Sequence, residues 1–227
     1  MLRGTFTGDA EIDAPLLDSV AVPWHRPSAQ TPVKHALIIG AGLAGCSTAA
    51  ALAKRGIQVT VIDRNEPASG ASGNPQGVLY TKLSPTPGEL NLFTLHSFLF
   101  SLAYYRERLN KGSIQGDLCG VLQLANSKKD AAQFDQLQEL FKDQDWLQFK
   151  QGSELQDISG IPISGRGYYY PQAGWLSPPS VCAADLAHPN IRLISHREAI
   201  SLVDGTSQWH IKDNSGNTVA SGDAIII

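Results

Sequence analysis

Four residues near the start of the chain have the types and the spacing needed to bind a nucleotide cofactor. Gly40, Gly42 and Gly45 form a G-x-G-x-x-G pattern, and Asp63 follows after a further helix-length and strand-length segment. In this pattern the first glycine allows a tight turn, the second lets backbone approach a pyrophosphate, and the third lets a helix pack closely on a strand. An acid at the later position accepts hydrogen bonds from ribose hydroxyls. The spacing therefore predicts a site for an adenine dinucleotide.

The segments around these residues have the pattern of a strand–helix–strand unit. The apolar run 35–39 predicts a buried parallel strand, and small residues up to Lys54 predict a helix that Gly56 stops. A second apolar run, 59–62, ends at Asp63. The helix N-terminus offers free N–H groups and the positive end of its dipole to phosphates. A strand–helix–strand unit without a ligand is the alternative, and the acid does not separate NAD from FAD.

A loop rich in glycine, serine and asparagine, residues 64–77, follows this acid directly. Its composition alone is typical of a flexible connector. Because it begins beside the predicted ribose, we expect it to pass over the mouth of the nucleotide site. The side chains of Ser72 and Asn74 would then line the rest of the cofactor.

The composition limits the class of protein. The chain has 227 residues, of which 42% are hydrophobic and 17% are charged, as in an ordinary globular protein. A net charge of −3 argues against a polybasic nucleic-acid binder, although a local basic face remains compatible with it. Three cysteines in no metal-binding pattern fit a reducing, cytoplasmic compartment, and Cys46 is predicted to be a small packing residue. No apolar run is long enough to span a bilayer, so we expect no membrane partner. The cysteine spacing likewise leads us to expect no metal.

The order of predicted elements indicates an α/β fold: a Rossmann-like FAD-binding domain with an inserted mixed α+β substrate domain. Residues 33–85 and 196–227 are assigned to the FAD-binding domain and 86–195 to the insertion. Proline-rich residues 1–32, which include Trp24, are predicted to be the linker or tail of an upstream domain. Because the chain ends inside a predicted strand, we expect a fragment truncated at its C-terminus. Helices are predicted at 88–111, 128–142 and 181–186, strands at 119–125, 168–170 and 191–194, a hairpin at 209–220, and a final strand from 223.

Two features of the insertion have open interpretations. The run Tyr168–Tyr170, followed by Gln172 and Trp175, is typical of sheet packing, and alternatively forms a platform for a flat ring. His96 lies on or near an apolar stripe of the helix at 88–111, where packing in the core is the simpler interpretation than ligand binding.

These motifs resemble those of the D-amino-acid oxidase-like family of FAD-dependent oxidoreductases. GAGLAG, the acid at Asp63 and GASGNPQG shortly after it match the layout of that family. Within it, PWHRP, ASGNPQGVLY, CGVLQLA and YPQAGWLSP are similar to the oxidoreductase half of bifunctional bacterial tRNA-modifying enzymes. The similarity covers nearly all of residues 22–227.

The resemblance implies FAD as the cofactor and tRNA as the substrate. The reaction is oxidation of a secondary amine that removes the carboxymethyl group from 5-carboxymethylaminomethyl-(2-thio)uridine at the wobble position. A methyltransferase domain of the same polypeptide would methylate the remaining aminomethyl group. No catalytic side chain is assigned, because the flavin performs the oxidation.

The resemblance also assigns roles to individual residues. The three glycines would hold the pyrophosphate, Asp63 the ribose, Arg64 the adenine, and the loop the flavin side. The residues expected to bind FAD are Gly40, Gly42, Ala44, Gly45, Asp63, Arg64, Ala71, Ser72, Gly73, Asn74, Gln76 and Gly77.

Later segments that complete the flavin and substrate sites in the family are absent from this sequence, so we expect weak FAD binding by the isolated chain. Two alternatives stay open at this point. An oxidase of glycine or sarcosine type would turn over a free amino acid without RNA. A non-catalytic dinucleotide-binding fragment would show no flavin spectrum.

Overall fold

A four-stranded parallel sheet in the described part of the chain contains the predicted strand–helix–strand unit. A computed structural model describes residues 32–86 and 88–227, so Trp24 and all but the last residue of the predicted tail lie outside the described residues. The unit considered below is Lys34–Ile227. The strand order is β13 (Ala224–Ile226), β1 (His35–Ile39), β2 (Gln58–Ile62), β9 (Ile191–Ile194), with every neighbour parallel. The predicted strands at 35–39, 59–62 and 191–194 are confirmed within a residue.

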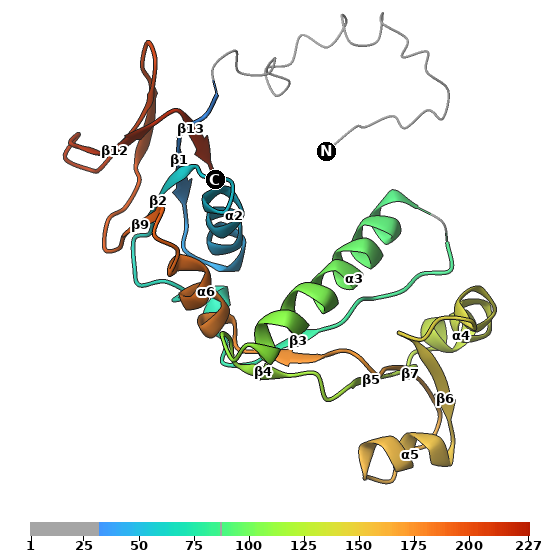
Figure 1. The fold of residues 1–227 in the computed structure, drawn as a ribbon. Coiled ribbons are helices and arrows are strands. Elements are labelled where there is room, and N and C mark those ends of the chain that lie inside the picture. Colours follow the sequence, from blue (N-terminus) through green and yellow to red (C-terminus); the bar gives the residue numbers. More distant parts are fainter. Residues whose placement is uncertain (1–31, 87) are drawn as a thin grey trace, which may run out of the picture. The chain divides into compact units, whose positions relative to one another are not determined.

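Two helices cover the sheet around the predicted site. Helix α2 (Leu43–Ala53) packs on β1 and β2, and α6 (Pro178–Leu186) packs on α2 and β9 (Figure 1). Their interface is lined by small side chains, which allow a close approach, and Cys46 and Cys182 are fully buried in it. Cys46 is therefore a packing residue, as predicted.

The described residues from β3 to β8 form two small antiparallel sheets and three α-helices. One sheet has the order β3 (Gly77–Leu79), β8 (Gly174–Leu176), β4 (Gly116–Asp117). The other has the order β5 (Val121–Leu124), β7 (Arg166–Tyr170), β6 (Gln148–Gln151). Helices α3 (Glu89–Asn110) and α4 (Lys128–Phe141) contribute apolar side chains to one core with the β7 tyrosines, while α5 (Ser153–Ser159) follows β6.

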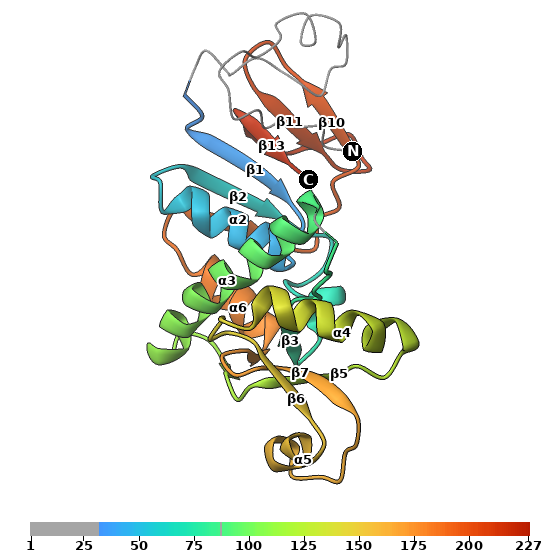
Figure 2. The same ribbon diagram turned by 90° about the vertical axis from the view of Figure 1, so that its right-hand side faces the viewer.

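A third antiparallel sheet, β10 (Ser201–Asp204), β11 (Trp209–Lys212), β12 (Thr218–Gly222), leads from β9 to the final strand. Figure 2 shows it in red and orange beside the β13–β1 edge. The predicted hairpin is confirmed, and Gly216 with φ of +79° makes its turn. Asp223 then joins both ends of the unit, because its carboxylate accepts hydrogen bonds from the amides of Lys34 at 2.8 Å and His35 at 2.9 Å.

Several expectations differ from the structure in detail. His96, placed on or near the apolar stripe of α3, is exposed, since the core face of this helix is formed by Leu95, Phe98, Leu99 and Leu102. Helix α5, with Gly152 at its N-cap, has no counterpart among the helices predicted above. The predicted division into two domains stays a prediction. Strand β9 pairs with β2 although residues 191–194 fall in the range assigned to the insertion, which favours an earlier end of that insertion.

Candidate dinucleotide-binding site

The three glycines form a tight connection between β1 and α2. Gly40 has φ of +104°, a conformation that side chains with a Cβ rarely adopt, and its amide donates to the carbonyl of Ile62 at 2.8 Å. A Cβ on Gly45 would lie 1.9 Å from the carbonyl oxygen of Gly40. Helix α2 therefore needs glycine at this position to lie so close to the turn, as the sequence pattern predicted.

The N-terminus of α2 is partly capped by a residue from the predicted cofactor loop. The hydroxyl oxygen of Ser72 accepts a hydrogen bond from the amide of Leu43 at 3.0 Å, and a Cβ on Gly42 would meet this same oxygen at 3.0 Å. The first intrahelical hydrogen bond runs from the amide of Cys46 to the carbonyl of Gly42. Ala44 is exposed at this end of the helix. Amides of the first turn thus face the place where a pyrophosphate is expected.

Asp63 has a second role that the spacing did not predict. One carboxylate oxygen accepts a hydrogen bond from the amide of Ala41 at 2.7 Å, and the other accepts from Asn65 at 2.9 Å. The acid therefore fixes the glycine turn to the end of β2. Each oxygen keeps a further lone pair, so the carboxylate retains the capacity to accept from a hydroxyl group.

The loop 64–77 is held at the helix N-terminus. Its central turn η1 (Ala71–Gly73) packs on α6, and a Cβ on Gly73 would lie 2.6 Å from the carbonyl oxygen of Ala68. Gly77 is the first residue of β3, and a Cβ on it would lie 3.2 Å from the Cγ of Pro178. The other loop residues that were expected at the flavin are exposed: Ala71, Gly73, Asn74 and Gln76.

A cavity of about 480 Å³ lies next to Asp63, where the adenine was expected. Arg64, 71% exposed in its side chain, lies 3.9 Å from Glu198 at this cavity. His196 has φ of +57° and its Nε2 lies 2.6 Å from the carboxylate of Glu66. Of the residues that line this cavity, only Arg64 was predicted from the sequence. Residues 196–198 reach the cavity because β9, which precedes them, pairs with β2, and this pairing is not visible in the sequence. The lining residues are Arg64, Asn65, His196, Arg197, Glu198, Asp213 and Asn214.

A buried ion pair fastens α3 to the helices that carry the site. Arg108 of α3 lies 2.7 Å from the carboxylate of Asp185 in α6, and their side chains are 14% and 2% exposed. The hydroxyl of Ser47 in α2 donates to the same carboxylate at 3.1 Å. The carboxylate is thus shared by three helices, and its desolvation is offset by these partners.

The aromatic stretch of the insertion divides into core and surface. Tyr170 is fully buried, and its hydroxyl donates to the carbonyl of Thr81 at 2.8 Å. Tyr168 is also buried, so the platform interpretation is wrong for these two rings and the packing interpretation is correct. Gln172 accepts a hydrogen bond from Arg106, and Trp175 is only half-buried.

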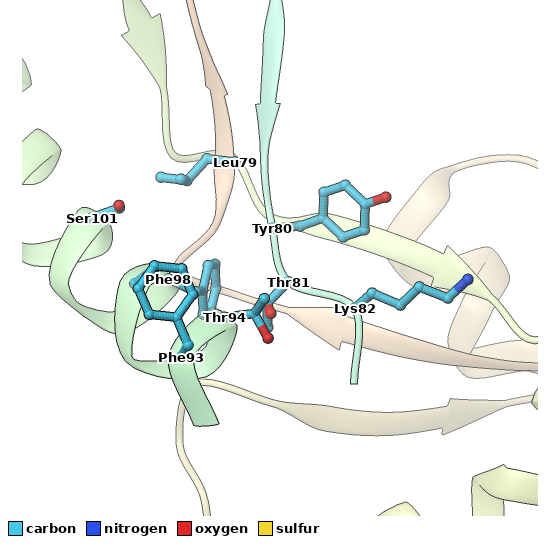
Figure 3. A pocket seen from close by; sticks show the side chains of 9 residues that line it. Leu79, Tyr80, Thr81, Lys82, Phe93, Thr94, Phe98 and Ser101 are labelled. Atoms are coloured by element: carbon cyan, nitrogen blue, oxygen red, sulfur yellow. The ribbon is translucent and has the colours of Figure 1, made fainter. Parts of the chain in front are cut away.

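A second cavity, of about 410 Å³, lies between residues 79–82 and α3 (Figure 3). Thr81 lines it, and the Thr81 hydroxyl has no hydrogen-bond partner among the described residues. Within residues 32–86 and 88–227, no cluster of three or more His, Cys, Asp or Glu side chains is placed to hold a metal. In the same residues, no helix is long and apolar enough to cross a membrane.

Comparison with known proteins identifies the family of this chain. The pattern of the FAD dependent oxidoreductase family, DAO, matches residues 35–227. The chain belongs to this family. The matched range begins at β1 and includes the glycine turn, Asp63, the loop and the insertion.

Several curated relatives from Pseudomonas have the same name, tRNA 5-methylaminomethyl-2-thiouridine biosynthesis bifunctional protein MnmC. The protein of *Pseudomonas entomophila* strain L48 is 40% identical over 229 residues, which cover 100% of this chain and 33% of the relative. That of *Pseudomonas putida* strain GB-1 is 44% identical over 189 residues, covering 82% of this chain and 28% of the relative. The chain thus spans about a third of the length of the curated relatives that it matches.

Solved structures support the fold. Glycine oxidase from *Geobacillus kaustophilus* matches with a TM-score of 0.66 and 23% identity, over 84% of this chain and 53% of the other. Iminodiacetate oxidase from *Chelativorans* sp. BNC1 matches with a TM-score of 0.62 and 20% identity, over 82% and 52%. The predicted mixed α/β fold with a parallel sheet is confirmed.

Proposed function

We propose that this FAD dependent oxidoreductase binds FAD along the glycine turn, the N-terminus of α2 and the loop that contacts it. The fit rests on three observations in this chain: the Gly45 contact with Gly40, the Ser72 hydroxyl on the amide of Leu43, and the exposed position of Ala44. Together they leave amide donors at a helix N-terminus and no bulky side chain over them.

Each segment has a separate part in this proposal. The amides of Ala44 and Gly45, which follow the Ser72-bound amide of Leu43, would receive the pyrophosphate. Asp63 would accept from the ribose while it holds the turn through Ala41. The cavity beside Arg64 would receive the adenine. The exposed loop residues, from Ala71 to Gly77, would run along the flavin side. When bound, FAD supplies a two-electron oxidation at a carbon next to an amine nitrogen.

The substrate that we propose is the wobble nucleoside 5-carboxymethylaminomethyl-(2-thio)uridine in tRNA. Oxidation of its secondary amine and hydrolysis by water would release the carboxymethyl group and leave an aminomethyl group. The observation that carries this assignment is the 40% identity to MnmC proteins over the full length of the chain. A methyltransferase part of a longer polypeptide, as the relatives' bifunctional name indicates, would act on the product.

The test uses the full chain purified with added FAD and tRNA that carries the carboxymethylated nucleoside. We expect a titration with FAD to show saturable flavin binding by the protein, and nucleoside analysis of the tRNA to show loss of the carboxymethyl group when FAD is in excess. Turnover of free glycine or sarcosine with unchanged tRNA would instead identify a small-amine oxidase. A protein that takes up no flavin at any FAD concentration would refute the proposed site.

A further inference from the structure

One face of the β3–β8–β4 sheet presents apolar and aromatic side chains to solvent. Trp175 of β8 lies opposite Val78 of β3 on one side and opposite Asp117 of β4 on the other. Directly opposed residues on neighbouring strands share a face, so these three side chains form one row. Val78 is 59% exposed, Asp117 is exposed and Trp175 is half-buried, whereas Leu176, on the other face, is buried.

Two more exposed side chains lie next to this row, on the segment that follows β3. Figure 3 shows Tyr80 and Lys82 on one side of this segment and Leu79 on the other, toward α3. Tyr80 is 46% exposed, and Lys82 is exposed without an ion-pair partner among the described residues. Alternation within β3 places Val78 on the side opposite Leu79, which is also the side of Tyr80 and Lys82 in Figure 3. We call this set the β3 face: Val78, Tyr80, Lys82, Trp175 and Asp117.

The β3 face follows the proposed cofactor loop directly in the chain. It begins one residue after Gly77, the last residue of the loop that places Ser72 on the N-terminus of α2. In the proposed function this loop runs along the flavin side. A substrate that meets the flavin there would therefore lie next to the β3 face.

The chemistry of the β3 face fits a nucleoside. Aromatic rings such as those of Trp175 and Tyr80 provide stacking surfaces for a base. Lys82 at one end offers a positive charge to a carboxylate or a phosphate, and Asp117 across the row repels such groups. The two charges would therefore orient an anionic nucleotide with its negative groups toward Lys82.

Resting on the proposed function, we infer that the β3 face binds the wobble nucleoside, with its pyrimidine ring against Trp175 and Tyr80 and an anionic group near Lys82. Trp175 and Tyr80 are then residues that select a nucleoside over a small amine. Base stacking on an aromatic ring is strong enough that its loss weakens binding by about tenfold or more.

The test measures binding of an anticodon stem-loop by the FAD-loaded full chain, with fluorescence anisotropy. One stem-loop carries the carboxymethylaminomethyl group and the other an unmodified uridine. The variants are Trp175→Leu and Tyr80→Leu, and the control is Phe100→Leu, an aromatic residue of α3 that is 69% exposed outside this face. Lys82→Met is paired with Lys128→Met, an exposed lysine at the start of α4.

We expect both aromatic variants to bind the modified stem-loop at least about tenfold more weakly, with unchanged flavin retention, and Phe100→Leu to bind as the unsubstituted chain. A loss in Lys82→Met with the modified stem-loop alone would identify the carboxylate as the anion, and an equal loss with both would identify a phosphate. Lys82→Met binding as tightly as Lys128→Met would refute the part assigned to Lys82.

Unchanged affinity in both aromatic variants, while the unsubstituted chain still demodifies tRNA, would overturn this inference and leave the proposed function intact. If Trp175→Leu and Tyr80→Leu also lose flavin, then these side chains support the flavin and not the nucleoside, and the inference is likewise overturned. If the unsubstituted chain binds neither stem-loop, the inference and the proposed tRNA substrate both fail.

Discussion

At the level of single residues, the carboxylate of Asp63 has two roles. It accepts hydrogen bonds from Ala41 and Asn65, which fixes the glycine turn, and in our proposal it also receives the ribose. A site built in this way loses cofactor affinity through both routes when the acid is removed. Its substitution is therefore the most direct test of the proposed site.

We expect Asp63→Ala to weaken FAD binding by about tenfold or more, because hydrogen bonds to a charged group contribute roughly 1.5–3 kcal/mol each. Equilibrium dialysis or flavin fluorescence measures this change. His96→Ala serves as the control, since His96 is exposed on α3. Equal losses in the two variants would contradict the site.

Gly45 determines how closely α2 approaches β1. A Cβ at this position would overlap the carbonyl oxygen of Gly40, so Gly45→Ala must displace the helix or the turn. We expect a loss of about 1–3 kcal/mol in the free energy of unfolding, measured in urea. Gly70→Ala is the matched control, because no atom lies within 4 Å of its would-be Cβ. A loss of the same size at Gly70 would show that the overlap at Gly45 is not the cause of the destabilisation.

At the level of elements, three helices meet at the carboxylate of Asp185. Arg108 brings α3 to it and Ser47 brings α2, so the relative position of these helices depends on one buried charge. Removing one partner of a buried pair leaves the other uncompensated, whereas replacing both with apolar residues is often tolerated.

We expect Arg108→Met to lower the free energy of unfolding by about 3–5 kcal/mol, and the double variant Arg108→Met, Asp185→Leu to recover much of that loss. Chemical denaturation of the single and double variants completes the cycle. The exposed pair of Glu107 and Lys111 provides a control, with an expected effect below about 1 kcal/mol. Additive losses in the double variant would contradict a role as a pair.

At the level of the whole molecule, Asp223 connects residues that lie 188 and 189 positions apart in the chain. Hydrogen bonds from the amides of His35 and Lys34 hold the pKa of this carboxyl below its ordinary value. Its contribution to stability is present above the unfolded-state pKa, about 4, and is lost as pH falls through the lower folded-state pKa.

Thermal unfolding from about pH 6 to pH 3 tests this dependence in Asp223→Asn. We expect the difference in Tm from the unsubstituted chain to be largest above about pH 5 and to shrink toward pH 3. A difference that stays constant over the range would refute the assigned cause.

The parts of the fold that were predictable depend on local signals. The strand–helix–strand unit around Gly40 and the hairpin before Asp223 follow from glycine positions and apolar runs, so their bounds agree with the structure within a few residues. Strands β3, β4 and β8 were not predicted, because two or three residues carry no periodicity and their partners lie far away in sequence.

The same distinction applies to the candidate site. The glycine turn is a short-range feature, and its close contact at Gly45 was foreseen. The bond from Asp63 to Ala41 and the placement of Ser72 on α2 depend on how the loop folds back, which spacing does not encode. Exposure of His96 likewise depends on which face of α3 its neighbours cover.

Because Cys46 and Cys182 are buried between α2 and α6, their reaction with a thiol reagent can report when these two helices separate. The neighbouring Cys182 thiol and burial raise the pKa of Cys46 far above its ordinary value, which keeps this sulfur protonated. Both cysteines are fully buried, so a reagent reaches neither sulfur while the helices are packed. Cys119 is exposed. In native protein we expect Ellman's reagent to modify Cys119 rapidly and the other two only as the helices separate. The slow phase would therefore report the rate at which α2 and α6 separate, and in our proposal added FAD should slow it further. Equal rates for all three thiols would contradict the buried contact.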